Sequence, residues 1–210
     1  MDPNEIDWAA LEELQEIAHE FEVDLYNAVI ANHSAMLEGI DREEENELLE
    51  IRDTLPIEDY DRVGSLLGYV QGGYDVRREK GTLTAVVALV TRFEHWISRF
   101  TRQLKLKAAR VHKNGLANLI EVLNKVLSDG PVAVTFFEEL AELRHSIVHA
   151  DSRAEWDYKG HRRRVADCYR NAWGDTALSE EQLKDAIQKS IQQVKWYDEQ
   201  ISAKPAVRPL

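Results

Sequence analysis

The sequence predicts an all-α protein: a helical bundle, preceded by an acidic helical extension and interrupted by one small β-hairpin insertion. Three observations lead to this fold class. Apolar residues recur at helical spacing over most of the chain, and capping pairs precede two of these stretches. Only one segment combines turn, aromatic and basic residues. The length of 210 residues suits one domain with an extension, or two small domains.

The first part of the chain predicts three helices. The first covers residues 7–37, with Asp7 as its N-cap and an apolar stripe of helical period. The second covers 42–54 and ends before Pro56, because the residue preceding a proline is pushed out of the helical region. A third helix runs through 57–70, although two glycines weaken its helical pattern.

A domain boundary is predicted at Gly72-Gly73, the best candidate hinge in the chain. Two adjacent glycines favour a turn over a helix because they lose the most conformational freedom on folding. We therefore expect an acidic helical region over 1–73, a helical bundle over 74–204 and a C-terminal tail over 205–210.

The second domain carries the clearest helical signals. A long apolar stripe runs from Leu83 to Leu104, and a shorter helix follows over 116–128. Two further helices are predicted to open with a capping box, in which two side chains satisfy the free N–H groups of the first turn. These pairs are Thr135 with Glu138 and Ser179 with Gln182.

The segment between the last two helices, residues 151–175, is rich in aromatic and basic side chains. Its Lys159-Gly160 pair suits a two-residue turn, so we expect a β-hairpin insertion near 153–165. The aromatic side chains either stack on unpaired bases or, as is more common, pack in the core. They are Trp156, Tyr158, Tyr169 and Trp173.

Charge is distributed unevenly along the chain. The net charge is −12, but residues 1–61 carry −18 and the remainder carries +6. Acidic helices commonly serve only to keep a protein surface hydrated. Alternatively, this region neutralises, or competes for, a basic surface on the remainder. The start is acidic and no apolar run approaches the roughly 20 residues that span a bilayer, so we expect a cytoplasmic protein. The lone Cys168 excludes an intrachain disulfide.

The stretch LAELRHSIVHADSR, residues 140–153, contains the candidate catalytic residues. A helix over 135–150 has a second apolar stripe beside its core stripe, and Arg144 lies within it. Such a helix is buried on two sides, inside its own domain or against a second chain. A guanidinium there needs an anionic partner, for example Glu94 of the same chain. The second stripe consists of Phe137, Ala141 and Val148.

Two histidines follow Arg144. His145 and His149 are four apart on one helix face, which suits a metal pair beside Asp151, but no further ligand is evident and we predict no metal site. His149 alternatively occupies a helix C-terminus, where the dipole favours a cation. Arg144 and His149 are five apart, so an ideal helix turns them about 140° from each other. They converge if the helix frays, if the arginine's length compensates, or if a second copy contributes.

Arg144, His145 and His149, in ELRHSIVHA near a helix end, resemble the signature of the HEPN superfamily. That signature is an arginine, four to six residues and a histidine, with a polar residue commonly after the arginine. The resemblance covers about residues 80–202. It implies a helical bundle that forms a homodimer with the two 135–150 helices facing each other. Many members are metal-independent ribonucleases in toxin–antitoxin, phage-defence or RNA-processing systems, whereas others have lost catalysis and serve as assembly modules.

The residue types fit RNA cleavage without a metal or cofactor. The 2′-OH attacks the adjacent phosphate once a base removes its proton, and histidine serves as base or acid near neutrality. Arginine binds the phosphate bidentately and stabilises its developing charge. The division of roles between His145 and His149 stays open. Six arginines are candidates for binding the RNA backbone: Arg92, Arg99, Arg102, Arg162, Arg163 and Arg164.

Two functional hypotheses follow. The first is a metal-independent endoribonuclease, a toxin or phage-defence effector whose substrate is RNA and whose protein partner is an antitoxin or another regulator. The second is a catalytically inactive helical module for protein–protein interaction. The chain has no P-loop, no dinucleotide-binding glycine pattern and no serine-hydrolase signature, so other common enzyme classes are not indicated.

Overall fold

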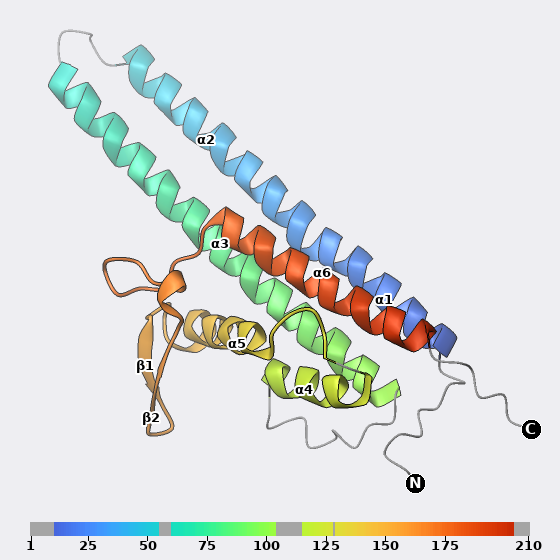
Figure 1. Cartoon of the computed structure of the whole chain (residues 1–210). Helices are drawn as coiled ribbons and strands as arrows, with labels where there is room; N and C mark the ends of the chain where they lie inside the picture. The colour runs from blue at the N-terminus through green and yellow to red at the C-terminus, as the bar shows by residue number, and fades with distance from the viewer. Residues whose placement is uncertain (1–10, 55–59, 104–114, 128, 204–210) are drawn as a thin grey trace, which may run out of the picture.

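A computed structural model describes residues 11–54, 60–103, 115–127 and 129–203. These residues are mostly helical, with one small two-stranded antiparallel sheet, as predicted. A long helical hairpin forms one side of the molecule, and three further helices pack against one end of it (Figure 1). Within the described ranges, no helix combines the length and apolar character that a membrane crossing needs.

The first arm of the hairpin is one continuous rod. It consists of α1 (Leu11–Leu25), a π-helical turn η2 (Tyr26–Ala31) and α2 (Asn32–Thr54). The prediction of two separate helices, over 7–37 and 42–54, is therefore wrong. As expected, however, α2 ends just before Pro56. The predicted N-cap and C-terminal tail lie outside the described residues.

The π-helical turn keeps one row of side chains on the core. The buried residues of this row are four apart, and in an ideal α-helix each such step drifts by about 40° around the axis. A π-helical turn has more residues per turn, which reduces the drift. The row therefore stays against the body of the protein over its whole length. Its members are Ile17, Phe21, Leu25 and Val29.

The second arm is α3 (Tyr60–Gln103), and it passes straight through Gly72 and Gly73. The predicted hinge at this pair is wrong, and the predicted domain boundary falls inside a helix. Each glycine costs about 1 kcal/mol in a helix interior. That cost is offset because Val70 and Tyr74, on either side, are buried with Ile40 of α2 in a small core of their own.

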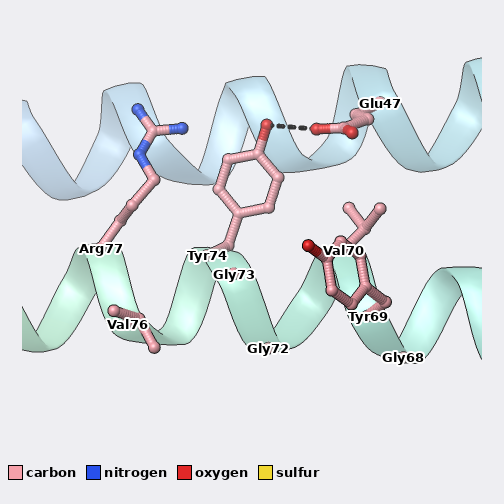
Figure 2. Close-up of a pocket in the computed structure, with 9 residues that line it drawn as sticks. All are labelled: Glu47, Gly68, Tyr69, Val70, Gly72, Gly73, Tyr74, Val76 and Arg77. Atoms are coloured by element: carbon pink, nitrogen blue, oxygen red, sulfur yellow. Dashed lines mark hydrogen bonds between the residues drawn. The ribbon is translucent and has the colours of Figure 1, made fainter.

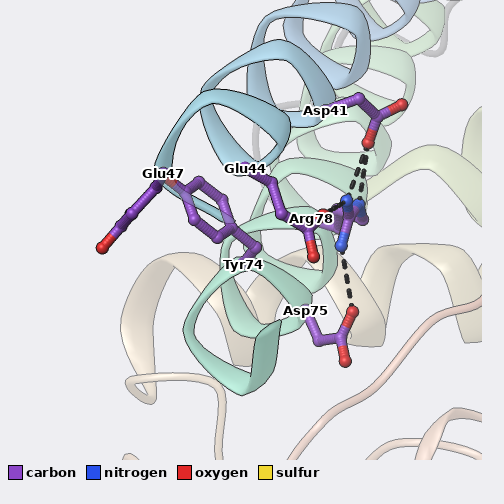
Figure 3. A network of polar contacts seen from close by, with 6 residues as sticks. All are labelled: Asp41, Glu44, Glu47, Tyr74, Asp75 and Arg78. Atoms are coloured by element: carbon purple, nitrogen blue, oxygen red, sulfur yellow. Dashed lines mark hydrogen bonds and ion pairs between the residues drawn. The ribbon is translucent and has the colours of Figure 1, made fainter. Parts of the chain in front are cut away.

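A polar network joins the two arms beyond the body of the protein (Figure 3). The Tyr74 hydroxyl donates a hydrogen bond of 2.8 Å to the Glu47 carboxylate. The Arg78 guanidinium donates to three carboxylates, and its bonds to Glu44 and Asp41 raise its pKa. The projecting part of the hairpin is thus held by its own contacts. The three carboxylates belong to Glu44, Asp41 and Asp75.

The main core lies where α1 and α3 meet α4 (Gly115–Leu127), α5 (Val134–His149) and α6 (Glu180–Ser202). Phe93 of α3 lies at its centre, with ring centroids 5.5 Å from Phe21 and 5.3 Å from Phe137. The Trp96 indole donates a 2.8 Å hydrogen bond to the Ile17 carbonyl. The acidic N-terminal arm therefore belongs to the same core as the rest of the protein.

Phe137 corrects one expectation about α5. The expected homodimer, with its two 135–150 helices facing each other, places the stripe that contains Phe137 against a second chain, but Phe137 is fully buried in the core of its own chain. Its ring packs against Phe93, which the helical period of α5 alone does not reveal. Of the other members of that stripe, Ala141 is half-buried and Val148 is 48% exposed.

The insertion before α6 is the predicted β-hairpin. Strands β1 (Glu155–Tyr158) and β2 (His161–Arg164) pair antiparallel. Lys159 and Gly160 form the turn with positive φ angles of 52° and 78°. Two such angles are typical of the type I′ turn, whose twist matches that of a hairpin.

One of the two predicted capping boxes is present. Ser179 and Gln182 cap α6 reciprocally, through hydrogen bonds of 3.1 Å and 2.8 Å. The predicted capping box of Thr135 and Glu138 is wrong, because α5 starts two residues earlier than that pair requires. Ala133 occupies the N-cap position and provides no side-chain hydrogen bond.

Candidate active site

A pocket of about 630 Å³ contains all three motif side chains. Arg144, His145 and His149 reach it from α5. The other walls come from α3, from the first turn of α4 and from the β-hairpin. Residues that line these walls include Glu94, Gly115, Tyr158 and Arg163.

Arg144 and His149 meet in this pocket although they are five residues apart. α5 remains helical through His149, so the approach does not come from fraying. At about 100° per residue, the α5 residues that line the pocket cover roughly 160° of the helix surface. The pocket is therefore wide enough to take both side chains from a single chain.

Arg144 has one partner and one unused donor. Its Nη1 donates a 2.8 Å hydrogen bond to Oε2 of Glu94, which confirms the intramolecular ion pair that the sequence suggested. Its Nε is buried and has no hydrogen-bond partner in the structure. A buried, unpaired donor of a guanidinium is costly, and an anion entering the pocket would satisfy it.

His145 is packed among aromatic rings. Its ring stacks on Trp156, with centroids 5.7 Å apart, and meets Tyr158 edge-on at 4.6 Å. Burial lowers the pKa of this imidazole, and the charges of His149, Arg163 and Arg144 lower it further. His145 is therefore neutral at pH 7, and its buried Nε2 has no hydrogen-bond partner in the structure. A neutral imidazole in this position can accept a proton.

His149 is the last residue of α5 and is exposed. Its ring centroid lies 4.7 Å from that of His145, so the two imidazoles form a pair. In the part of the chain that the structure describes, no group of three or more His, Cys, Asp or Glu side chains is placed to hold a metal ion.

Ser146 was not singled out from the sequence, yet it fixes the segment that follows α5. Its buried hydroxyl donates a 2.8 Å hydrogen bond to the Arg153 carbonyl. A second bond of 2.5 Å joins it to the Thr176 hydroxyl. These bonds hold the chain at the start and end of the insertion against α5. The β-hairpin is consequently positioned beside the two histidines.

Arg163 is the only one of the six candidate RNA-binding arginines among the residues that line the pocket. Its Nη1 donates a 2.8 Å hydrogen bond to Oε1 of Glu142 on α5. Its Cζ lies 5.4 Å from the ring centroid of Tyr158. The hairpin therefore adds a second guanidinium to the site of the motif arginine.

Two of the three candidate arginines of α3 pair with carboxylates of the acidic arm. Nη1 of Arg99 lies 2.6 Å from Oε2 of Glu20. Nη1 of Arg92 lies 3.3 Å from Oδ2 of Asp24. For these two residues, the structure confirms that the acidic region neutralises a basic surface. The other three candidates are exposed and lie outside the pocket lining, and their role in RNA binding stays a prediction. They are Arg102, Arg162 and Arg164.

The aromatic side chains of the insertion fall into two groups. Trp156 and Tyr169 are buried and serve packing. Tyr158 is half-buried in the pocket, and Trp173 is 86% exposed on the loop before α6. Only the last two have surface to offer a ligand.

A second pocket of about 660 Å³ lies on the projecting part of the hairpin (Figure 2). Glycines of α3 form its floor, and Tyr69 beside them is 82% exposed. It is lined by no histidine or cysteine, and its Tyr74 and Arg77 are bonded to carboxylates of α2. Its carboxylate, from Glu47, accepts a hydrogen bond from Tyr74, and no imidazole lines it, so the pocket at α5 with its histidine pair is the better candidate active site.

No protein-family model, curated protein or solved structure significantly matches the chain. The resemblance of the α5 motif to the HEPN signature therefore rests on its three residues and their position in the fold. The chemistry of the site has to be inferred from its own contacts.

The lowered pKa of His145 predicts how stability depends on pH. In the unfolded chain the ordinary value is 6.5, so below this pH the unfolded state binds the proton before the folded state does. The stability of the protein should fall between pH 6.5 and the lowered pKa. Urea unfolding at about pH 7.5 and about pH 5.5 measures the change. The variant His145→Gln should lose less stability over this range than the wild type.

The matched control is His161→Gln, in an exposed position of the hairpin. It should keep the pH dependence of the wild type. If His145→Gln and the wild type lose equal stability on acidification, His145 is not held neutral by its surroundings.

Proposed function

We propose that the protein is a metal-independent endoribonuclease of the HEPN type. The observation that supports this most is the meeting of Arg144, His145 and His149 in one pocket, with an unused guanidinium donor and a neutral imidazole. These are the groups needed to bind a phosphodiester and to move two protons. An RNA substrate makes the cytoplasm the expected place of action.

The reaction uses the nucleophile that RNA itself carries. His145 accepts the proton of the 2′-OH, the 2′-oxygen bonds to the adjacent phosphorus, and the bond to the 5′-oxygen breaks. His149 donates a proton to the leaving 5′-oxygen. Arg144 binds the phosphate through Nε and stabilises its developing charge. The products are a 2′,3′-cyclic phosphate and a 5′-hydroxyl end, and no step requires a metal.

The deciding experiment is incubation of the purified protein with end-labelled single-stranded RNA, with and without EDTA. We expect equal cleavage in both, and product ends that carry a 2′,3′-cyclic phosphate or its hydrolysis product. Cleavage that stops on chelation and returns with a divalent cation would overturn the mechanism.

A homodimer through α5 is part of the proposal. With Phe137 buried in its own chain, the surface left for a second copy is the pocket rim around Ala141 and Val148. Light scattering at micromolar concentration should give twice the mass of one chain, and Ala141→Glu should reduce it to one. An antitoxin or another regulatory protein is a further proposed partner.

The alternative function is a catalytically inactive helical module for protein–protein interaction. It is favoured by the pairing of Arg144 with Glu94 and of Arg163 with Glu142, since both guanidiniums are engaged without a substrate. The RNA experiment separates the two functions, because such a module leaves the RNA intact.

A further inference from the structure

We propose that Arg163 of the β-hairpin is a substrate-binding residue of the site: it binds a second phosphate of single-stranded RNA, and Glu142 occupies it until RNA arrives. This inference rests on the proposed ribonuclease function and extends it beyond the motif. It assigns to the insertion a task in substrate binding, with Arg144 holding the scissile phosphate and Arg163 a neighbouring one.

The register of the hairpin directs Arg163, and not its neighbours, into the pocket. Side chains alternate along a strand, so Arg162 and Arg164 lie on the opposite face from Arg163. The cross-strand partner of Arg163 is Trp156, whose buried ring packs against His145. The anchored tryptophan therefore turns this face of the sheet towards the motif. Arg162 has a 78% exposed side chain and pairs with a carboxylate of its own hairpin.

The pairing with Arg163 uses only one of the two carboxylate oxygens of Glu142. Oε1 of Glu142 accepts from Arg163, but Oε2 is buried without a hydrogen-bond partner in the structure. A buried carboxylate oxygen without a hydrogen bond is costly, so a pair that only stabilises the fold is not expected to leave one. Phosphate oxygens accept hydrogen bonds from the planar guanidinium in the same two-pronged arrangement as carboxylate oxygens, so RNA can replace the carboxylate.

Charge in the pocket favours this exchange over simple addition. Three carboxylates and two guanidiniums line it, so these five side chains together carry −1. Each guanidinium is paired with one of these carboxylates, so a phosphodiester gains its full attraction only by replacing that carboxylate. Arg163 keeps its place during the exchange because its Cζ also lies 5.4 Å from the ring centroid of Tyr158.

The test measures binding without cleavage. The probe is a fluorescent single-stranded RNA with 2′-O-methyl groups, which lacks the nucleophile, titrated at one salt concentration. Arg163→Ala should weaken binding roughly 10- to 100-fold, as expected for a charge-assisted hydrogen bond. Arg77→Ala removes the same charge from the projecting part of the helical hairpin, where that guanidinium also donates to a carboxylate, and should change binding by less than about threefold. Glu142→Gln frees Arg163 and should tighten binding several-fold.

The three variants keep the inference falsifiable even if one of them unfolds. Tighter binding by Glu142→Gln is not expected from a contact that only supports the fold. Equal binding by Arg163→Ala and Arg77→Ala, or no gain from Glu142→Gln, overturns the role of Arg163. If the wild type cleaves RNA under those outcomes, the proposed function stands without this inference. If the wild type neither binds the probe nor cleaves RNA, both are overturned.

Discussion

Replacing Arg144 or His149 with alanine should abolish RNA cleavage by the purified protein. Removing a preorganised donor to a transition-state oxyanion typically costs about 100- to 1,000-fold in rate. Removing a general acid or base costs roughly 100- to 10,000-fold. Initial rates on labelled single-stranded RNA measure both effects, and each variant should fall close to the background without enzyme.

The ion pair of Arg144 provides a sharp control. Glu94→Gln breaks the same 2.8 Å contact but leaves the guanidinium in the pocket. If Arg144 acts on the phosphate, Glu94→Gln should retain activity while Arg144→Ala loses it. If the pair only supports the fold, the two variants should lose activity together. Full activity of Arg144→Ala would remove the phosphate-binding role altogether.

Replacing Phe21 with alanine should lower the free energy of unfolding by about 3–5 kcal/mol, the usual cost of deleting a fully packed phenyl ring. Phe21 is 2% exposed, and its ring contacts both Phe93 and Trp96 of α3. Chemical unfolding in urea, with a constant slope, measures the loss. The control Tyr26→Ala, at a side chain that is 59% exposed, should change stability far less.

This second result decides whether the acidic N-terminal arm is a removable shield. If Phe21→Ala is as stable as the wild type, α1 rests on the body without contributing to its core, and the arm can be treated as a separate domain. With the expected loss, the arm is part of the folding unit. RNA then competes with the carboxylates of the acidic arm for Arg92 and Arg99 by replacing single ion pairs, and no whole domain has to move.

Local signals in the sequence predicted local structure well. The Lys159-Gly160 turn and the cap at Ser179 each depend on a few neighbouring residues, so their chemistry is readable without the rest of the fold. The Gly72-Gly73 hinge failed because burial of the flanking side chains against α2 outweighs the helical cost of two glycines. That packing partner lies far away in the sequence.

The candidate site was predictable in part. The motif residues came from the resemblance to the HEPN signature, whereas the pairing of Arg144 with Glu94 followed from helical period and the cost of an unpaired guanidinium. The burial of Phe137 did not follow, because a period identifies an apolar face but not the surface that covers it. The sequence also did not predict that Arg163, alone among the six candidate arginines, lines the pocket. Its position depends on the hairpin register and on Trp156.

The π-helical turn over Tyr26–Ala31 makes the packing of the first arm sensitive to insertions and deletions within that turn. Deleting one residue there would rotate α2 by about 100° relative to α1. Ile40 would then leave α3, and charged residues would take its place in the small core of the projecting hairpin. Substitutions such as exchanges at the exposed Tyr26 disturb neither helix. Over evolutionary time the arm should therefore tolerate sequence drift at exposed positions of this turn while rejecting insertions and deletions within it.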